Sequence, residues 1–426
     1  MPKVVVVGGG WSGCAAALSA KKAGADVVIL ERTDMLLGTG LVGGIMRNNG
    51  RFTATEEMIA MGGGELFEIA DSVARHRNID FPGHKHASLY DVSKIEPEVK
   101  KALLEKGVEI HLVSRAKNIE MEGKRITAVL TDNGERFEAD VFIETTGTAG
   151  PMGNCTKYGN GCAMCIMRCP SYGPRISIAA KAGVEEKVAK KADGSVGAMS
   201  GSCKLLKESL SEEIVEKLNK TGVAIIPVPE ELQKKDALSQ KACQQYALKE
   251  FAENIILLDT GHAKLMTPYF PLEKLRKIPG FEYARFEDPY AGNIGNSMRY
   301  IGISPRDNYL KTEGVENLFC AGEKAGPLVG HTEAIVTGTL AGNNAVRFLA
   351  GKELLQLPTS LAVGDAIAHV KEQMATEEGI SKKYTFSGSV YFERMKQKNL
   401  YTTNIKEIKA RVEDAGMTNI FNQKIL

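Results

Sequence analysis

The sequence has few cysteines, a single tryptophan and no long apolar run. Eight cysteines in 426 residues are too few for the disulfide-rich scaffolds of small secreted domains. No uncharged apolar stretch approaches the roughly 20 residues of a transmembrane helix. The first residues, MPKVVVVGGG, form a short apolar run that ends in glycines, which predicts a strand and not a signal peptide. We therefore expect a cytoplasmic protein with no membrane partner.

An excess of charge of either sign is also missing. Lys and Arg number 54 and Asp and Glu 52, for a formal net charge of +2. No global field therefore marks a nucleic-acid-binding protein, although a local basic patch would be compatible with this balance. The length and a hydrophobic content of 43% suffice for a large core and for about two or three domains.

The start of the chain contains a strand, a glycine turn, a helix and a second strand. Residues 3–7, KVVVV, form a β-branched run typical of a buried parallel strand. The segment GGGWSG follows and places Gly8, Gly10 and Gly13 in the G-x-G-x-x-G pattern. The next residues, CAAALSAKKAG, predict a helix, and a second apolar strand, DVVIL, ends at Glu31. This order predicts a dinucleotide-binding unit.

Each residue type in this unit has a physical reason to be there. Gly8 permits the tight turn, Gly10 lets the backbone approach a pyrophosphate, and Gly13 lets the helix pack close to the sheet. The pyrophosphate would bind at the helix N-terminus, where N–H groups and the helix dipole favour an anion. Glu31 stands near the spacing at which an acid accepts ribose hydroxyls.

Further strands and turns follow the first unit. Residues 109–113, EIHLV, predict a strand, and a hairpin turn is predicted at 132–134. A strand through 141–144 then leads into Thr146-Gly147. Far downstream, VENLFCAGEKAG repeats the pattern of a strand that ends in glycines, and TEAIVTGTLAGNNAVRFLAG predicts a helix rich in small residues.

These segments together resemble the FAD-binding domain of the glutathione-reductase-like flavoproteins. The segments ERTDMLLGTGLVGG, ADVFIETTGTAG and NLFCAGEKAG, with EAIVTGTLAGNNAVR, resemble two related families within that group. One contains the broadly defined FAD-dependent oxidoreductases. The other contains the flavoproteins of tRNA modification, namely the glucose-inhibited division protein A family and the folate-dependent tRNA uridine methyltransferase. The resemblance covers about residues 1–150 and 280–375.

The resemblance implies FAD as the cofactor and assigns residues in both halves of the chain to it. It implies Gly8, Gly10, Trp11, Ser12 and Gly13 at the pyrophosphate, Glu31 and Arg32 at the adenosine ribose, Thr39 and Gly40 near the flavin or ribityl chain, Ala116 at the adenine, Thr146, Gly147, Gly322 and Glu323 closing the site, and Gly338 at a helix end against the flavin.

The expected fold class is α/β: a Rossmann-like FAD-binding domain of the glutathione-reductase type with an inserted α+β cap domain and a helical C-terminal tail. In the cap, apolar residues recurring at three and four predict helices at 206–219 and about 230–253. The expected boundaries are 1–150 for the first part of the FAD domain, 151–280 for the cap, 281–350 for the second part of the FAD domain, and 351–426 for the helical C-terminal segment.

The cap begins with a loop that holds half of the cysteines. CTKYGNGCAMCIMRCPSYG contains Cys155, Cys162, Cys165 and Cys169 in the spacing Cys-x6-Cys-x2-Cys-x3-Cys-Pro. The last three cysteines and the proline match the end of the bacterial ferredoxin run, which favours a [4Fe–4S] cluster. The open alternatives are redox-active thiols at Cys162 and Cys165 that relay electrons to the flavin, a zinc site, which this short spacing suits less well, and small buried apolar residues that bind nothing.

Three residues are candidates for catalysis because the resemblance places their loop beside the flavin. His331, Lys324 or Glu333 could hold or move a proton, or stabilise the anion of the reduced flavin. The alternative for His331 is a surface histidine in a glycine-rich loop. His84 and His86 alternate without a third metal ligand, so we expect them to face solvent.

The leading hypothesis is an FAD-dependent oxidoreductase that transfers electrons between the flavin and a redox centre in the cysteine loop. Its partner would be a small-molecule substrate or a redox protein. The alternative is an FAD-dependent RNA-modifying enzyme that transfers a one-carbon unit to a uridine of tRNA or rRNA, against which the near-zero net charge argues mildly. The final segment, IKEIKARVEDAG, predicts an amphipathic helix that packs on the body or on a second copy in a homo-oligomer.

Overall fold

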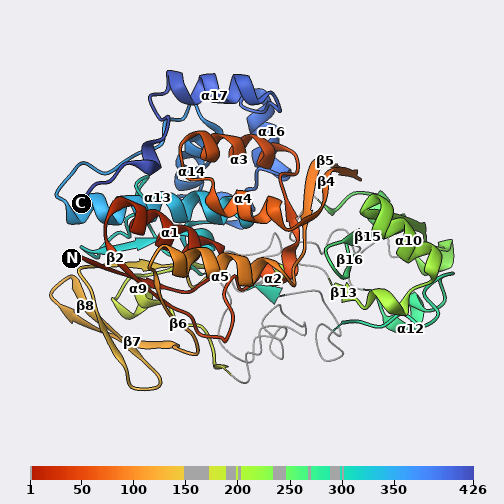
Figure 1. Ribbon diagram of the computed structural model, residues 1–426, viewed down its shortest axis with the longest axis horizontal. Helices are drawn as coiled ribbons and strands as arrows, with labels where there is room; N and C mark the ends of the chain where they lie inside the picture. The colour runs from red at the N-terminus through yellow and green to blue at the C-terminus, as the bar shows by residue number, and fades with distance from the viewer. Residues whose placement is uncertain are drawn as a thin grey trace.

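The computed structural model describes residues 2–147, 172–188, 198–199, 203–233, 246–266, 270–287, 298–299 and 302–426 (Figure 1). A five-stranded parallel sheet forms its centre, with β1 in the middle. Across the sheet the strands are β19 (Leu318–Cys320), β10 (Val141–Glu144), β1 (Lys3–Val7), β2 (Asp26–Leu30) and β6 (Glu109–His111).

The valines of β1 alternate between two different cores. Val4 and Val6 belong to the core under α1 (Trp11–Ala23) and α13 (His331–Leu349). Val5 and Val7 face the opposite core, which includes apolar residues of an antiparallel three-stranded sheet. A strand buried on both faces explains the unbroken β-branched run in the sequence. The strands of that second sheet are β7 (Ala116–Glu122), β8 (Arg125–Thr131) and β9 (Arg136–Glu138).

Helices α1 and α13 lie side by side on one face of the central sheet (Figure 1). A Cβ on Gly338 would overlap the carbonyl oxygen of Ser12, and one on Gly342 would overlap that of Ala16. The small residues of α13 are therefore explained by the close approach of two helix backbones. Gly338 lies inside α13, which begins at His331, so it does not form the helix end that the resemblance implied.

Helices and a small sheet connect β2 to β6. They are α2 (Gly40–Gly43), β3 (Ile45–Met46), α3 (Gly50–Ala60), α4 (Glu65–Ser72), β4 (Ala74–Phe81), β5 (His84–Tyr90) and α5 (Ile95–Glu105). Strand β5 pairs with β3 on one side and with β4 on the other. Its C-terminal half is buried, and its last residue, Tyr90, reaches the site described below.

The cap contains a four-stranded antiparallel sheet, termed the cap sheet here, at one end of the molecule (Figure 1). Its strands are β13 (Cys203–Leu205), β16 (Ala263–Leu265), β15 (Asn254–Asp259) and β14 (Val223–Pro227). Helices α10 (Glu212–Thr221), α11 (Glu250–Glu253) and α12 (Leu272–Leu275) accompany it, with 3-10 turns η1 (Lys207–Ser209) and η2 (Glu230–Leu232).

The helices predicted in the cap are partly wrong. The predicted helix at 206–219 begins only at Glu212, after the 3-10 turn η1. Residues 234–245 of the second predicted helix lie outside the described residues, and in the described parts of 230–253 α-helix is limited to the single turn of α11. The strands that flank this range, β14 and β15, pair with each other and bury their apolar residues in the cap core.

Short elements join the cap to the rest of the chain. Helix α9 (Ile178–Lys181) packs near β7. Two short antiparallel ladders pair segments far apart in sequence, and the 3-10 turn η5 (Gly322–Ala325) follows β19. The ladders join β11 (Lys187–Val188) to β18 (Gly302–Ile303) and β12 (Ala198–Met199) to β17 (Met298–Arg299).

The C-terminal segment is helical, as predicted, and packs over α3 (Figure 1). The amphipathic helix expected near the C-terminus is confirmed as α17, which buries Ile408 and Val412. Among the described residues, no helix is both long enough and apolar enough to cross a membrane. The elements of this segment are α14 (Ala362–Gln373), α15 (Glu377–Ser381), α16 (Ser389–Gln397), α17 (Ile405–Asp414) and η6 (Ile420–Asn422).

Candidate functional site

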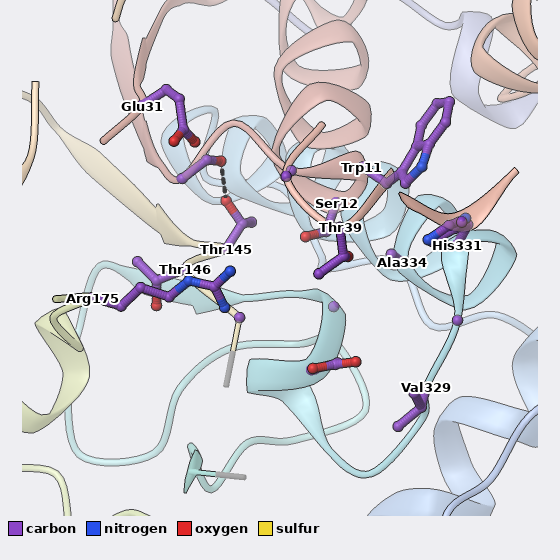
Figure 2. A pocket seen from close by; sticks show the side chains of 18 of the residues that line it. Trp11, Ser12, Glu31, Thr39, Thr145, Thr146, Arg175, Val329, His331 and Ala334 are labelled. Carbon is purple, nitrogen blue, oxygen red and sulfur yellow. Dashed lines mark hydrogen bonds between the residues drawn. The ribbon is translucent and has the colours of Figure 1, made fainter. Parts of the chain in front are cut away.

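A cavity lies at the carboxyl ends of β1, β2 and β10 and extends to the start of α13 (Figure 2). Figure 2 shows Glu31 at one end of the cavity and Trp11 and His331 at the other. This position, outside the carboxyl ends of parallel strands, is the usual ligand site of open α/β sheets. The residues assigned to FAD that line it are Gly8, Gly10, Trp11, Ser12, Glu31, Arg32, Thr39, Ala116, Thr146, Gly147, Gly322 and Glu323.

The glycine turn has the geometry of a pyrophosphate cradle. Gly8 has a φ of +105°, which side chains rarely tolerate. A Cβ on Gly13 would overlap the carbonyl oxygen of Gly8, so Gly13 is needed for the turn itself. A Cβ on Gly10 would meet nothing within 4 Å, so the protein alone does not require glycine there. Gly10 faces the cavity instead, where a side chain would occupy the space of a bound anion.

Glu31 holds the glycine turn from the end of β2. Its Oε2 accepts a hydrogen bond from the backbone N–H of Gly9 at 2.7 Å, and its Oε1 accepts from the N–H of Thr33 at 2.8 Å and from the Thr33 hydroxyl at 3.1 Å. A carboxylate can accept about four hydrogen bonds. The three donors leave capacity for a ribose hydroxyl, which fits the role expected for Glu31.

Thr145 fixes the same turn from β10. Its hydroxyl lies 2.6 Å from the carbonyl oxygen of Gly8 and 3.0 Å from that of Val7 (Figure 2). Sequence reasoning placed only Thr146 and Gly147 in the site and missed Thr145. The signal was present, because Thr145 directly follows a buried strand that was predicted to end at the cavity. Arg175 also lines the cavity (Figure 2), and nothing in its sequence context marked it.

Three rings meet at the flavin end of the expected site. The ring centroids of Trp11, Tyr90 and His331 lie 6.0 to 6.3 Å apart. Gly40 and Gly43 of α2 leave room for them, because a Cβ on Gly40 would overlap the Trp11 indole and one on Gly43 would overlap the His331 imidazole. Gly40 therefore supports the site from behind and does not line the cavity.

The hydrogen bonds of Tyr90 indicate the tautomer of a neutral His331. The Tyr90 hydroxyl donates to the carbonyl oxygen of Gly40 at 2.6 Å, and it lies 3.3 Å from Nδ1 of His331. A phenol has one proton, and burial raises the pKa of Tyr90, so this proton stays in place. The hydroxyl can then only accept from Nδ1–H of His331. A neutral His331 therefore has its basic nitrogen at Nε2.

Besides Arg175 and Ile176, the cap provides Tyr246, Lys264 and Met266 to the cavity. Lys264 belongs to β16 and donates to the carbonyl oxygen of Val42, in α2, at 2.6 Å. Met266 is buried in an apolar cluster against which Tyr246 packs. None of the three was predicted. They reach the site because the cap packs against the segment around α2. No local sequence pattern predicts this packing.

Lys324 is not among the residues that line the cavity. Its side chain is 3% exposed and forms ion pairs with Glu186 and, at 3.7 Å, with Glu144. Glu144 also accepts from the backbone N–H groups of Ile178 and Ala179 at the start of α9. The two carboxylates raise the pKa of Lys324 against the opposing effect of burial. This lysine therefore joins segments of the fold as a buried cation.

The four cysteines of the predicted metal or redox loop lie outside the described residues. Within the described ranges, no group of three or more His, Cys, Asp and Glu side chains is arranged to hold a metal ion. Cys14 and Cys320 are fully buried, and burial raises the pKa of both thiols, that of Cys320 to about 12. Both therefore behave as small apolar residues at neutral pH.

The expectation that His84 faces solvent is wrong. Its side chain is buried between two aromatic rings, with the ring centroid of Phe81 at 4.6 Å and that of Tyr246 at 4.8 Å. His86 instead lies near the surface, where its Nδ1 is 3.1 Å from Oδ1 of Asn78. Residues two positions apart share a face of a regular strand, but the pairing of β5 with β4 shifts register between His84 and Ala87, and His86 has a φ of +62°.

The family model for glucose inhibited division protein A matches residues 3–267 and 259–353. The chain belongs to this family. The match covers both halves of the central sheet, the glycine turn and the cap sheet. It agrees with the predicted fold class, a Rossmann-like FAD-binding fold of the glutathione-reductase type, which is confirmed.

Individual relatives of the family resemble this chain over shorter stretches. A methylenetetrahydrofolate–tRNA-(uracil-5-)-methyltransferase TrmFO of Thermosipho melanesiensis is 35% identical over 98 residues, 22% of this chain and 22% of the relative. The tRNA uridine 5-carboxymethylaminomethyl modification enzyme MnmG of Chlorobaculum tepidum is 41% identical over 110 residues, 25% of this chain and 17% of the relative. The similarity thus spans less than a quarter of each relative's length.

The fold likeness to a solved family structure extends over nearly the whole chain. GidA of Aquifex aeolicus superposes with a TM-score of 0.65 and covers 98% of this chain and 72% of the GidA chain, at 16% sequence identity. The described part of the chain therefore has the GidA fold.

Proposed function

We propose that the protein is an FAD-dependent enzyme that modifies a uridine of RNA by transfer of a one-carbon unit. In this proposal, residues 1–150 and 281–350 hold the cofactor, residues 151–280 form the cap on the substrate side, and residues 351–426 support the FAD domain. Membership of the glucose inhibited division protein A family supports the proposal. So do the names of two relatives, both of which specify a tRNA uracil or uridine as the target.

The observation that carries the proposal is a single cavity with a cofactor side and a cap side. The cofactor side contains the glycine turn and Glu31, and the cap contributes Tyr246, Lys264 and Met266. A cavity bounded by both parts can bring a substrate on the cap against a cofactor held by the sheet. This arrangement supports a bound substrate that reacts at the cofactor, and not a cofactor with a purely structural role.

The residues present fit FAD. Gly8, Gly10 and Gly13 with the N-terminus of α1 would hold its pyrophosphate, and Glu31 would hold its ribose. The bound flavin supplies redox chemistry, and the protein supplies its position and surroundings. Trp11, at the end of the cavity away from Glu31 (Figure 2), closes the site behind the glycine turn.

His331 is the residue we propose for proton transfer. It lines the cavity at the first position of α13. Tyr90 orients it through Nδ1, so that a neutral His331 presents Nε2 as a base. Lys324 is not part of this proposal, because its ammonium is paired with Glu144 and Glu186.

The test is an RNA modification assay. Purified holoprotein is incubated with a flavin reductant, methylenetetrahydrofolate and an unmodified tRNA transcript or rRNA fragment, and the RNA is then digested and analysed by mass spectrometry. We expect one uridine to gain a one-carbon group with the holoprotein and none with the apoprotein. Nucleosides of unchanged mass with both RNAs would overturn the proposal.

A second candidate function rests on the spacing of Cys155, Cys162, Cys165 and Cys169. An FAD-dependent oxidoreductase with a [4Fe–4S] cluster or a pair of redox thiols in this loop would pass electrons between the loop and the flavin. Iron and sulfide analysis of protein purified without oxygen, together with its visible spectrum, tests this candidate. Flavin absorbance without iron or sulfide would remove the cluster and leave thiol chemistry, which titration of reactive thiols would then detect.

A further inference from the structure

The cap side of the cavity contains an aromatic ring with a firm support behind it. Tyr246 lines the cavity. The His84 ring lies 4.8 Å from it at an interplanar angle of 34°, and the Phe251 ring meets it edge-on at 5.9 Å. His84 in turn stacks on Phe81 at 4.6 Å and 26°. Tyr246 thus ends a column of rings that runs from the β4–β5 hairpin to the cavity.

Hydrogen bonds fix the middle ring of this column. Arg51 donates from its Nη1 to Oδ1 of Asn48 at 3.3 Å. An arginine only donates, so Asn48 must present its oxygen to Arg51 and its Nδ2 group to His84. That Nδ2 lies 2.9 Å from Nδ1 of His84, which is therefore the acceptor. His84 is buried, and both its stacking and its hydrogen bond hold it as a rigid support for Tyr246.

A cation of the cap borders the same cavity. Lys264 is 5% exposed and is oriented by its hydrogen bond of 2.6 Å to the carbonyl oxygen of Val42. Lys264 lines the cavity, and its ammonium has three donor hydrogens. A ring to stack on and a donor at the edge are the two features with which proteins bind a nucleobase in a single strand.

We propose that Tyr246 and Lys264 form the base-binding subsite, in which Tyr246 stacks on the uracil ring of the target uridine and Lys264 donates to a ring carbonyl oxygen. The inference rests on the proposed function and adds the residues that recognise the substrate. Stacking is tolerant of base identity, whereas a donor to a carbonyl favours uracil over a base that presents an amino group at that position. The cap would thus determine which base is bound, and the central parallel sheet would hold the cofactor.

The test compares two short single-stranded RNAs that differ only at one position, one with a uridine and the other with an abasic site. Binding to the FAD-loaded protein is followed by fluorescence anisotropy of the labelled RNA. The ratio of the two dissociation constants isolates contacts to the base from contacts to the backbone. We expect the uridine RNA to bind at least about 10-fold more tightly to the unaltered protein, as stacking on one aromatic ring allows.

Variants of the protein then show whether this ratio of dissociation constants depends on the proposed subsite. Tyr246→Ala should reduce the ratio to near one, Lys264→Met should lower it, and Tyr246→Phe should preserve it. Tyr283→Ala is the matched control, because Tyr283 is 84% exposed and does not line the cavity. Equal flavin content in all variants shows that the fold is intact.

The outcomes separate the two proposals. A ratio that survives in Tyr246→Ala overturns the subsite and leaves the proposed function standing. A ratio near one in the unaltered protein also overturns the subsite, even where RNA is modified. Unchanged nucleosides in the modification assay overturn the proposed function, whatever the ratio is.

Discussion

Nε of Arg51 lies 3.1 Å from both carboxylate oxygens of Glu333, in a pair that is almost completely buried. Glu333 also accepts from the Thr385 hydroxyl at 2.6 Å and from the backbone N–H of Phe386 at 2.8 Å. The pair therefore ties the first turn of α13, which carries His331, to α3 and to the C-terminal segment. It gives Glu333 a structural role in place of the proton transfer that its sequence position suggested.

Replacing Glu333 by Gln should destabilise the protein strongly. The change leaves the Arg51 cation buried without its counter-charge, and breaking a buried ion pair in this way costs about 3 to 5 kcal/mol of unfolding free energy. Urea denaturation of the holoprotein measures the loss. Glu313→Gln is the control, because Glu313 forms an exposed pair with Lys371 and should change little. Equal stability of the two variants would contradict the role given to Glu333.

The glycine turn gives a prediction that separates folding from cofactor binding. Gly10→Ala should leave the stability of the apoprotein nearly unchanged, because the new Cβ meets nothing within 4 Å and the φ of Gly10 is −69°. It should nevertheless weaken FAD binding at least about 10-fold, since the methyl group occupies the space of the pyrophosphate. Gly13→Ala should instead destabilise the apoprotein, because its Cβ would overlap the carbonyl oxygen of Gly8.

Thermal unfolding of the apoproteins and equilibrium dialysis of FAD measure the two effects. Tight FAD binding by Gly10→Ala would contradict the placement of the pyrophosphate. An apoprotein of Gly13→Ala as stable as the unaltered one would contradict the packing of the turn.

The cofactor end of the site was predictable because its signals are local. The run from residue 3 to Glu31 specifies strand, turn, helix and acid within one short segment, and the structure places each where the pattern predicts. Glycines that are required for steric reasons, such as Gly13, can be recognised in the sequence because they occur at the fixed spacing of the G-x-G-x-x-G pattern. The fold of both halves of the FAD domain followed from the same kind of pattern.

The cap end was not predictable, because its residues meet through contacts between distant segments. Lys264 donates a hydrogen bond to the carbonyl oxygen of Val42, 222 positions away. Tyr246 packs at the cavity against the ring of His84 in strand β5. A lysine in a short strand and a lone tyrosine have no distinguishing pattern. The short apolar runs at 223–227 and 254–259 form paired strands, and periodicity alone cannot separate such runs from helix.

Glu57 should make the stability of the protein fall as pH rises. Burial is the largest cause that raises its pKa, from 4.5 to about 7, although the N–H groups of Ala362 and Val363 donate to its carboxylate at 2.9 and 3.0 Å. Because the folded state holds this proton more tightly than the unfolded state, its contribution is full below pH 4.5 and is lost as pH rises through about 7. Between pH 5 and 8 the loss is about 2 to 3 kcal/mol.

Comparison with Glu57→Gln isolates this group from others that titrate. The variant has no proton to lose, so the stability of the unaltered protein relative to the variant should fall by that amount from pH 5 to pH 8 in urea denaturation. Glu353→Gln, at an exposed position, should show no such trend. A pH-independent difference for Glu57→Gln would show that the buried carboxylate is ionised throughout.

Tyr90→Phe should slow the reaction without loss of the cofactor. The variant removes the oxygen that accepts from Nδ1–H of His331, so a neutral imidazole no longer has its proton directed to Nδ1 and its base to Nε2. We expect turnover in the RNA modification assay to fall about 10-fold or more, which is part of the roughly 10²- to 10⁴-fold that general base catalysis contributes. FAD binding should be unchanged, because the glycine turn and Glu31 are not altered. Tyr401→Phe is the control, since Tyr401 packs on Phe392 in the C-terminal segment and does not line the cavity. Full activity of Tyr90→Phe would show that His331 does not depend on Tyr90 for its orientation, whereas equal losses in both variants would point to a general effect on the fold.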